Sequence, residues 1–184
     1  MRSSYWRSYS YKQTYEIMIL NVNQKLKKEV WQYLKTNNIA NRSKADGNKE
    51  EQFVGLLGEI LIKNHFNIEH NYSDGFDGGY DFIYKGKKFD VKTMGRNVDP
   101  KPYYVNNFIG YQLNYDCDKY IFCSLNKKTN KLSVCGWVTK EELKTRGDLF
   151  VIGQERTRSD GSSFKLKAPT LEIKNNQLNN INDL

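Results

Sequence analysis

The chain of 184 residues has the length of one domain with short extensions, and a chain of this length needs neither disulfides nor a metal ion to fold. Its 29 lysines and arginines outnumber its 21 acidic residues, which gives a formal net charge of +8 and favours polyanionic partners. Aromatic residues make up 14% of the chain, a content that excludes an intrinsically disordered polypeptide.

The cysteines and the apolar residues exclude further classes of protein. Only three cysteines occur, without a Cys-x-x-Cys pair, so neither a disulfide framework nor a zinc site is indicated. No apolar run approaches the roughly 18 residues of a membrane span, and the N-terminus lacks the apolar core of a signal peptide. We therefore expect a soluble, cytoplasmic protein without a membrane partner. The high content of Asn, Lys and Tyr is typical of an AT-rich genome such as that of a phage, in which case the compartment is the host cytoplasm.

Residues 1–45 are predicted to form a basic, aromatic arm followed by a helix. Residues 1–18 interleave cations with aromatic rings, a pattern that suits either contacts to nucleic acid or an arm that packs its rings on the domain. Helical spacing of apolar residues predicts an amphipathic helix over 23–37. The residues on its apolar face are Leu26, Val30, Trp31 and Leu34.

A second helix is predicted over 49–66, at the start of a central unit that spans residues 46–145. Its main apolar face consists of Phe53, Leu56, Leu57, Ile60 and Leu61. Ile62 lies off that face, so we expect the helix to contact the rest of the protein on two sides. Glu59 shares this second side with Gly55, and a carboxylate in partly apolar surroundings is an informative exception.

A β-hairpin is predicted over residues 80–93, after a glycine-rich turn. If its turn is centred on Lys85 and Gly86, Asp81 lies opposite Asp90, with Cβ atoms about 4.5–5.5 Å apart. Like charges at that distance repel each other, and Lys92 on the same face compensates in part. A divalent cation compensates better, because Mg²⁺ combines carboxylate ligands with water molecules.

Three interpretations of this hairpin compete on the residues alone. It is a surface hairpin with solvated charges, the centre of a metal-dependent phosphodiesterase, or a structural hairpin that Ca²⁺ stabilises. The third interpretation lacks the 12-residue loop that is typical of a calcium site.

The remaining elements alternate between strands and short helices. Residues 102–115 fit either a strand or a helix, whereas 119–125 and 131–138 read as strands. A capping box at Thr139 predicts a short helix over 139–144. Cys123 and Cys135 alternate with apolar residues in the two strands and are predicted to be small core residues.

Residues 146–184 are predicted to form a C-terminal β extension. The segment after residue 147 resembles a hairpin around a charged loop, and the polar tail over 175–184 is expected to fray. Among the remaining polar residues, His65 is expected on a helix surface or at an interface, since no Cys or His spacing near it suggests zinc.

The helix with Gly58 and Glu59, the stretch Tyr80-Asp81-Phe82 and the stretch Asp90-Val91-Lys92 together resemble the PD-(D/E)XK nuclease superfamily. This superfamily includes restriction endonucleases, Holliday-junction resolvases and phage nucleases, and the resemblance covers roughly residues 49–140. It implies that Asp81 and Asp90 are the motif acidic residues, Lys92 the motif lysine and Glu59 the helix carboxylate. Tyr80 stands where the family motif has proline, and Asp74 or Asp77 is an alternative to Asp81.

The chemistry that the resemblance implies is hydrolysis of phosphodiester bonds with Mg²⁺ or Mn²⁺, which leaves a 5′-phosphate. Asp81, Asp90 and the Val91 carbonyl would hold one metal ion, and Glu59 a second ion or a metal-bound water. Lys92 would orient or deprotonate the nucleophile. Gln112 and Tyr115 follow the hairpin where some members carry an auxiliary glutamine or tyrosine, although a structural role fits them as well.

Basic residues around the hairpin are candidates for contacts to phosphates. Arg96 and Lys101 follow the second strand of the hairpin, while Arg156 and Arg158 lie in the charged loop of the C-terminal extension. A solvated basic face is the alternative interpretation of these four residues.

We therefore predict an α/β fold with a restriction-endonuclease-like core, in which helices flank a central mixed β-sheet, with an N-terminal helical arm and a C-terminal β extension. The predicted function is that of a Mg²⁺-dependent DNA endonuclease on duplex or branched DNA, with RNA left open as a substrate. Cleavage at a junction or at a specific site would favour a homodimer. The alternatives are a nucleic-acid-binding module that does not cut and a small regulatory or interaction protein.

Overall fold

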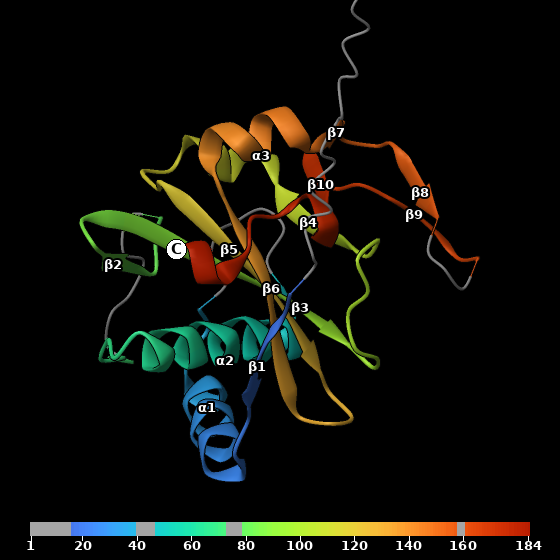
Figure 1. Ribbon diagram of the computed structural model, residues 1–184. Coiled ribbons are helices and arrows are strands. Elements are labelled where there is room, and N and C mark those ends of the chain that lie inside the picture. Colours follow the sequence, from blue (N-terminus) through green and yellow to red (C-terminus); the bar gives the residue numbers. More distant parts are fainter. Residues whose placement is uncertain (1–15, 40–46, 73–78, 158–160) are drawn as a thin grey trace, which may run out of the picture.

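The computed structural model describes residues 16–39, 47–72, 79–157 and 161–184. Its central element is a curled sheet of five strands (Figure 1): β1 (Met18–Asn21), β2 (Phe82–Tyr84), β3 (Lys87–Arg96), β5 (Lys119–Asn126) and β6 (Lys131–Thr139). The strand order is β1-β6-β5-β3-β2. Because β3 and β5 are parallel while the other neighbours are antiparallel, the sheet is mixed, as predicted.

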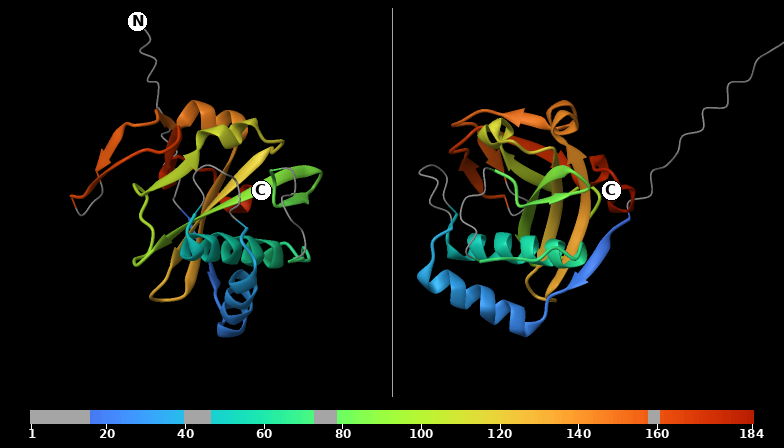
Figure 2. Two further views of the ribbon diagram at one scale, coloured as in Figure 1. Left: turned by 180° about the vertical axis from the view of Figure 1, so that it is seen from behind. Right: turned by 90° about the vertical axis from the view of Figure 1, so that its left-hand side faces the viewer.

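Two helices, α1 (Gln24–Thr36) and α2 (Lys49–His65), pack together against one face of this sheet (Figure 2). Side-chain caps begin both helices, since Asn23 accepts the Leu26 amide at 2.7 Å and Asn48 forms a capping box with Glu51. The predictions of both helices are therefore confirmed. α2 is buried on two sides, which agrees with the complete burial of Ile62.

Trp31 departs from the predicted apolar face of α1. Leu26, Val30 and Leu34 are buried as expected, whereas Trp31 is 39% exposed. It lies at the margin of the apolar stripe, where its ring stacks on Phe53 of α2 instead of entering the core. The predicted amphipathic helix is therefore confirmed, with Trp31 as the exposed member of its apolar face.

The strands of the sheet separate two apolar cores. Along β5, Ile121 and Cys123 contact the core beneath α1 and α2, while Tyr120 and Phe122 contact the core on the opposite face. This alternation is the two-residue period of a strand that is buried on both faces. Cys123 and Cys135 are both buried, which confirms their prediction as core residues.

A smaller sheet and a helix cover the opposite face. The sheet has the strands β4 (Val105–Ile109), β10 (Thr170–Lys174) and β7 (Asp148–Phe150), in the order β4-β10-β7. The helix is α3 (Lys140–Arg146), which begins at the predicted capping box of Thr139 and Glu142. The ambiguous segment 102–115 contains both β4 and a 3-10 helix over Gly110–Asn114.

The C-terminal extension is more complex than one hairpin. β8 (Glu155–Thr157) and β9 (Ser163–Lys165) form a separate two-stranded ribbon, which projects from the body of the protein (Figures 1 and 2). β10 then returns to the body and pairs with both β4 and β7. The expected hairpin is thus confirmed only for the ribbon.

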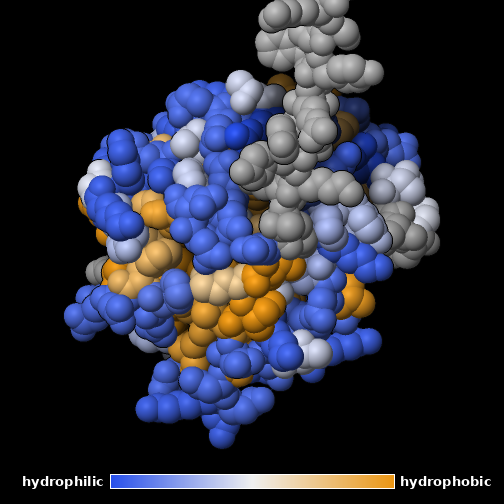
Figure 3. Space-filling view, viewed as in Figure 1, coloured by the Kyte–Doolittle hydropathy of each residue, from blue (hydrophilic) through white to orange (hydrophobic). Residues whose placement is uncertain are grey.

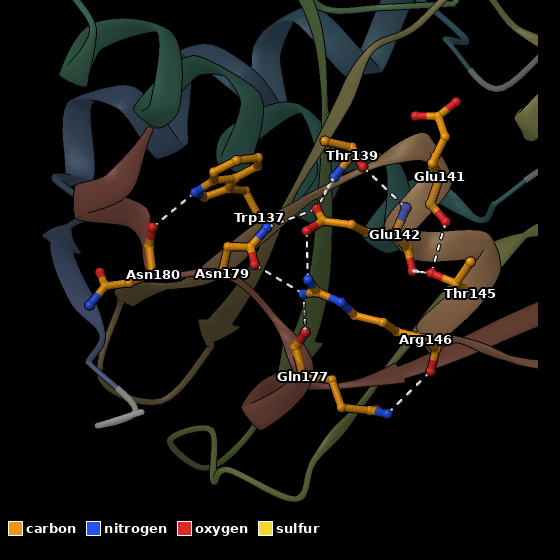
Figure 4. Close-up of polar contacts among 9 residues, drawn as sticks. All are labelled: Trp137, Thr139, Glu141, Glu142, Thr145, Arg146, Gln177, Asn179 and Asn180. Carbon is orange, nitrogen blue, oxygen red and sulfur yellow. Dashed lines mark hydrogen bonds and ion pairs between the residues drawn. The ribbon is translucent and has the colours of Figure 1, made fainter. Parts of the chain in front are cut away.

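The polar C-terminal tail docks on the sheet, so the expectation that it frays is wrong. Leu178 and Ile181 are buried, and the backbone of Asn179 pairs with Trp137 of β6. The Asn179 side chain donates to Glu142 at 2.8 Å, within the network of polar contacts shown in Figure 4. Two apolar side chains and a few specific hydrogen bonds outweigh the polar composition of this segment.

The surface that faces the viewer in Figure 3 is hydrophilic around its periphery, and apolar residues gather near its middle. Ile19 of β1 is one of the apolar residues on the surface of the protein, with an exposed fraction of 48%.

Across the described ranges, no helix combines the length and the apolar character that a membrane span requires.

Candidate active site

The predicted hairpin forms in the predicted register. Phe82 pairs with Phe89 and Tyr84 with Lys87, which places the turn at Lys85 and Gly86. Both turn residues have positive φ angles, of 48° and 71°, as the tightest hairpin turns require.

Asp81 lies immediately before β2, at the open end of the hairpin. Its amide donates to the Phe89 carbonyl at 2.7 Å, and its own carboxylate accepts the Val91 amide at 2.7 Å. These two contacts hold Asp81 beside β3, near Asp90. The pairing of the two aspartates predicted from the register is therefore present in position, although β2 itself begins one residue later.

A close contact between α2 and β3 brings Glu59 to the hairpin. A Cβ atom built on Gly58 would lie 1.9 Å from the Thr93 hydroxyl oxygen, so only glycine allows the helix to approach this near. Glu59, the next residue of the helix, is consequently held over the strand that carries Asp90 and Lys92. Gly55 has no such contact, because a Cβ atom there would meet nothing within 4 Å.

One cavity of about 410 Å³ is lined by all four residues that were predicted to be catalytic. Glu59 enters it from α2, Asp81 from the start of the hairpin, and Asp90 and Lys92 from β3. Asn107, Tyr111 and Gln112, which belong to β4 and the following 3-10 helix, line it as well. The structure thus gathers side chains that are more than 30 residues apart in the sequence around one hollow.

Lys92 neutralises the buried carboxylate of Asp90. The Lys92 ammonium lies 2.7 Å from one carboxylate oxygen of Asp90 and 2.6 Å from the other. Asp90 is only 5% exposed, so removal of the lysine would leave a buried charge without its partner. This ion pair is the charge compensation that the sequence predicts for Lys92.

The carboxylate of Glu59 is held by two side chains, Lys63 and His70, that were not predicted from the sequence. The buried Lys63 donates to its carboxylate at 2.7 Å, and His70 Nδ1 lies 3.5 Å from the same oxygen. Burial raises the pKa of Glu59, but the contacts with His70 and Lys63 outweigh that effect and lower the pKa below its ordinary value. Glu59 therefore stays ionised at neutral pH.

The sequence contained a signal for only one of these two partners. Lys63 follows Glu59 by four residues, which is the spacing of neighbours on a helix surface. His70 reaches the same oxygen from the segment after α2, and no periodicity relates it to Glu59.

Asp81 has an electrostatic environment opposite to that of Glu59. Burial, together with the negative charges of Asp90 and Glu59, raises the pKa of Asp81 well above its ordinary value. Lys92 and the amide of Val91 act in the other direction but do not reverse the shift. An added cation next to Asp81 would relieve this repulsion.

The donor atoms around Asp81 fit a hard cation that keeps several water molecules. Asp81 and Asp90 line the cavity with carboxylate oxygens, and Mg²⁺ is commonly held by one or two carboxylates with water completing its shell. In the part of the chain that the structure describes, no group of three or more His, Cys, Asp or Glu residues is arranged so that it could hold a metal ion. An ion at this place would therefore need water molecules for most of its ligands, beside one or two carboxylates.

The basic residues predicted to contact phosphates differ in their surroundings. Arg96 lies over the Tyr104 ring at 5.0 Å and donates to the Val105 carbonyl at 2.6 Å, so it braces the segment that leads to β4. Lys101 is exposed beside the Tyr103 ring. Arg96 thus has a structural role, while the contacts of both residues to phosphates stay a prediction.

In the projecting ribbon, Arg156 makes a two-point contact with Glu172, at 3.0 and 2.5 Å. Its guanidinium also lies 3.8 Å from the centre of the Phe150 ring. These contacts tie the ribbon to β10 and β7.

Several predictions fall outside the described residues. They concern Arg158, the alternative acidic residues Asp74 and Asp77, and the basic, aromatic segment 1–15.

Two auxiliary predictions can also be placed. Gln112 is 4% exposed and lines the cavity, whereas Tyr115 lies outside the lining and packs against Gly79. His65 is exposed at the end of α2, as expected for a helix-surface residue.

Comparisons of the chain with family models, with curated proteins and with solved structures found no match. The functional argument therefore depends on the residues and their geometry.

Proposed function

We propose that the protein is a metal-dependent nuclease with a restriction-endonuclease-like core of the PD-(D/E)XK type. The observation that carries this proposal is the meeting of Glu59, Asp81, Asp90 and Lys92 around one cavity. Asp81 and Asp90 supply carboxylate oxygens for a hard cation, with the Lys92 ammonium beside them and Glu59 in the same cavity. The surrounding chain has a net charge of +8, which suits a phosphate polymer.

In this proposal each residue of the cavity has a separate task. Asp81, Asp90 and the Val91 carbonyl hold Mg²⁺ or Mn²⁺, an ion that activates water and offsets charge on the attacked phosphate. Lys92 orients the attacking water and neutralises charge that develops in the transition state. Glu59, kept ionised by Lys63 and His70, accepts a hydrogen bond from that water or from the hydration shell of the ion.

The proposed substrate is DNA, cut internally, with a duplex or a branched form as the candidate structure. Net positive charge favours the phosphate backbone without selecting a sequence, and the acidic cavity selects the metal ion rather than the backbone. RNA meets the same electrostatic conditions, so the substrate panel below includes it.

One observation favours a second candidate, a module that binds nucleic acid without cutting it. Asp90 and Glu59 are already paired with Lys92 and Lys63, so two of the three carboxylates are neutralised without a metal ion. Such a module would bind nucleic acid in a salt-sensitive manner. It would release no product on addition of Mg²⁺.

A cleavage panel separates the two candidates. Linear duplex, four-way junction, single-stranded DNA and RNA are each incubated with the protein, in Mg²⁺ and in EDTA. The nuclease proposal predicts shortened or nicked product from at least one substrate in Mg²⁺ and none in EDTA. Binding to any of them without product in either Mg²⁺ or Mn²⁺ would instead establish the second candidate.

A further inference from the structure

A second hollow region lies on the other side of α2 from the proposed active site. One hollow, of about 280 Å³, lies between α1, the first turns of α2 and the turn that joins β5 to β6. A neighbouring hollow, of about 340 Å³, lies along the outer surface of α1. Lys27 and Trp31 line both of them, so the two hollows adjoin at Trp31, and together they are called the groove below.

Trp31 presents a rigid aromatic surface in this groove. Its ring stacks on Phe53 with centroids 4.4 Å apart and planes 12° from parallel, and the residue remains 39% exposed. Because Phe53 is buried in α2, the indole is held in one orientation before any ligand arrives. A fixed, exposed indole is a stacking surface for a flat ring, and it loses little conformational freedom on binding.

The rim of the groove is basic. Lys27, Lys28, Lys35 and Lys127 line it, against Glu50 as its single acidic lining residue within the described chain. Lys127 is paired with Glu50 at 2.8 Å, and Lys27 donates to the neutral Asn130 side chain at 2.7 Å. The groove therefore keeps a net positive charge, and Figure 3 shows hydrophilic side chains at the lower end of the molecule, where α1 lies in Figure 1.

We propose that this groove binds a single-stranded segment of nucleic acid, with a base stacked on Trp31 and phosphates on the surrounding lysines. An unpaired base exposes the ring face that Trp31 needs, whereas the bases of a duplex are stacked on one another. An apolar peptide could pack on the indole, but it would bring no negative charges to the four lysines. Charge and ring together select a strand that carries both phosphates and free bases.

The position of the groove relates it to the proposed cavity. Phe53, Val54 and Leu57 of α2 line the groove, while Gln52, Gly55 and Glu59 of the same helix line the cavity. One helix diameter, about 10–12 Å, separates the two sites, a distance that a few nucleotides span. The assignment rests on the proposed function only in that the strand held at Trp31 belongs to the molecule that is cut.

The test measures binding of fluorescein-labelled oligothymidylate of about ten nucleotides, a length within the usual range for one single-strand site. The full chain carries Asp90→Asn, so that cleavage does not consume the probe. Trp31→Ala is expected to weaken binding about tenfold or more, and Trp31→Phe to retain most of the affinity. Lys28→Gln should lower the slope of log affinity against log salt by about 0.7, whereas Lys144→Gln on α3 should leave it unchanged.

The outcomes distinguish this site from the proposed enzyme. Equal affinity of the Trp31→Ala, Trp31→Phe and parent proteins would overturn the groove, even if the wild-type protein cuts DNA in Mg²⁺. A Trp31-dependent change from dimer to monomer without a change in oligonucleotide affinity would also overturn it, because the groove would then hold a second copy. Loss of binding in Trp31→Ala together with an inactive wild-type protein would support the groove and count against the nuclease.

Discussion

The most informative single substitution in the cavity is Asp81→Asn. The Asp81 carboxylate accepts a hydrogen bond from the Val91 amide at 2.7 Å, and the side-chain oxygen of asparagine can accept the same bond. Asparagine lacks the negative charge, however, which Asp90 and Glu59 repel. Two unit charges about 6 Å apart repel by about 3 kcal/mol at an effective dielectric constant of 20, and Lys92 offsets part of this. We therefore expect the variant to gain roughly 1–2 kcal/mol of stability in the absence of divalent ions, at pH values above the raised pKa of Asp81.

The sign of the pH dependence follows from the direction of the pKa shift. Burial and the two neighbouring charges raise the pKa of Asp81 in the folded protein, so the folded state binds the proton more tightly than the unfolded state. The wild-type protein thus loses stability as pH rises from the ordinary carboxyl pKa through the raised value. The advantage of Asp81→Asn should accordingly be full above the raised pKa and shrink as pH falls toward about 4.

Urea unfolding, followed by tryptophan fluorescence in EDTA and in Mg²⁺, measures both effects. Mg²⁺ at ten times its dissociation constant should stabilise the wild-type protein by about 1.4 kcal/mol and Asp81→Asn by much less. Asp81→Ala serves as the control for the hydrogen bond, since it also removes the acceptor of the Val91 amide and should be less stable than Asp81→Asn by about 1–2 kcal/mol. If Asp81→Asn is less stable than wild type at every pH from about 4 to 9, and Mg²⁺ stabilises both proteins equally, the proposed repulsion at Asp81 is refuted.

Three further substitutions test the supports of the cavity and of the fold. Lys92→Met should lower the free energy of unfolding by roughly 2–3 kcal/mol, because it leaves Asp90 unpaired. Adding Asp90→Asn to the same chain should restore most of this loss. Equal thermal stability of the single and double variants would contradict this. Gly58→Ala should destabilise the protein by roughly 1–3 kcal/mol, whereas Gly55→Ala, with open space at its Cβ, should gain about 0.5–1 kcal/mol; calorimetry of the pair checks the close helix–strand contact. Ile181→Ala should cost roughly 2–5 kcal/mol in urea unfolding, and an unchanged midpoint would mean that the tail is not part of the core.

The helices and the hairpin were predictable because their signals are local. Caps, apolar periods and a Lys-Gly turn lie within a few residues of the elements that they specify, and α1, α2 and the register of β2 on β3 follow from them. The docked tail was not predictable from such signals. Its hydrogen bonds join Asn179 to residues of β6 and α3 about 40 positions earlier, and no local pattern encodes that distance.

The candidate site likewise has one part that local sequence signals predict and another part that they do not. Asp81, Asp90 and Lys92 belong to one hairpin, so strand alternation alone placed them near one another. The approach of Glu59 depends on the contact between Gly58 and Thr93, two residues more than 30 positions apart in the sequence. The exposure of Trp31 likewise depends on how far α2 covers α1, which helical spacing within α1 does not specify.

The most direct test of the central claim is the rate at which the protein nicks supercoiled plasmid in Mg²⁺. Wild type is compared with Asp90→Asn, which alters the cavity, and with Glu141→Gln, which removes an exposed carboxylate of α3 outside it. The account predicts nicking by wild type and Glu141→Gln that EDTA abolishes, and a rate at least about 1,000-fold lower for Asp90→Asn, equivalent to about 4 kcal/mol in the barrier. Equal rates for Asp90→Asn and wild type would contradict it.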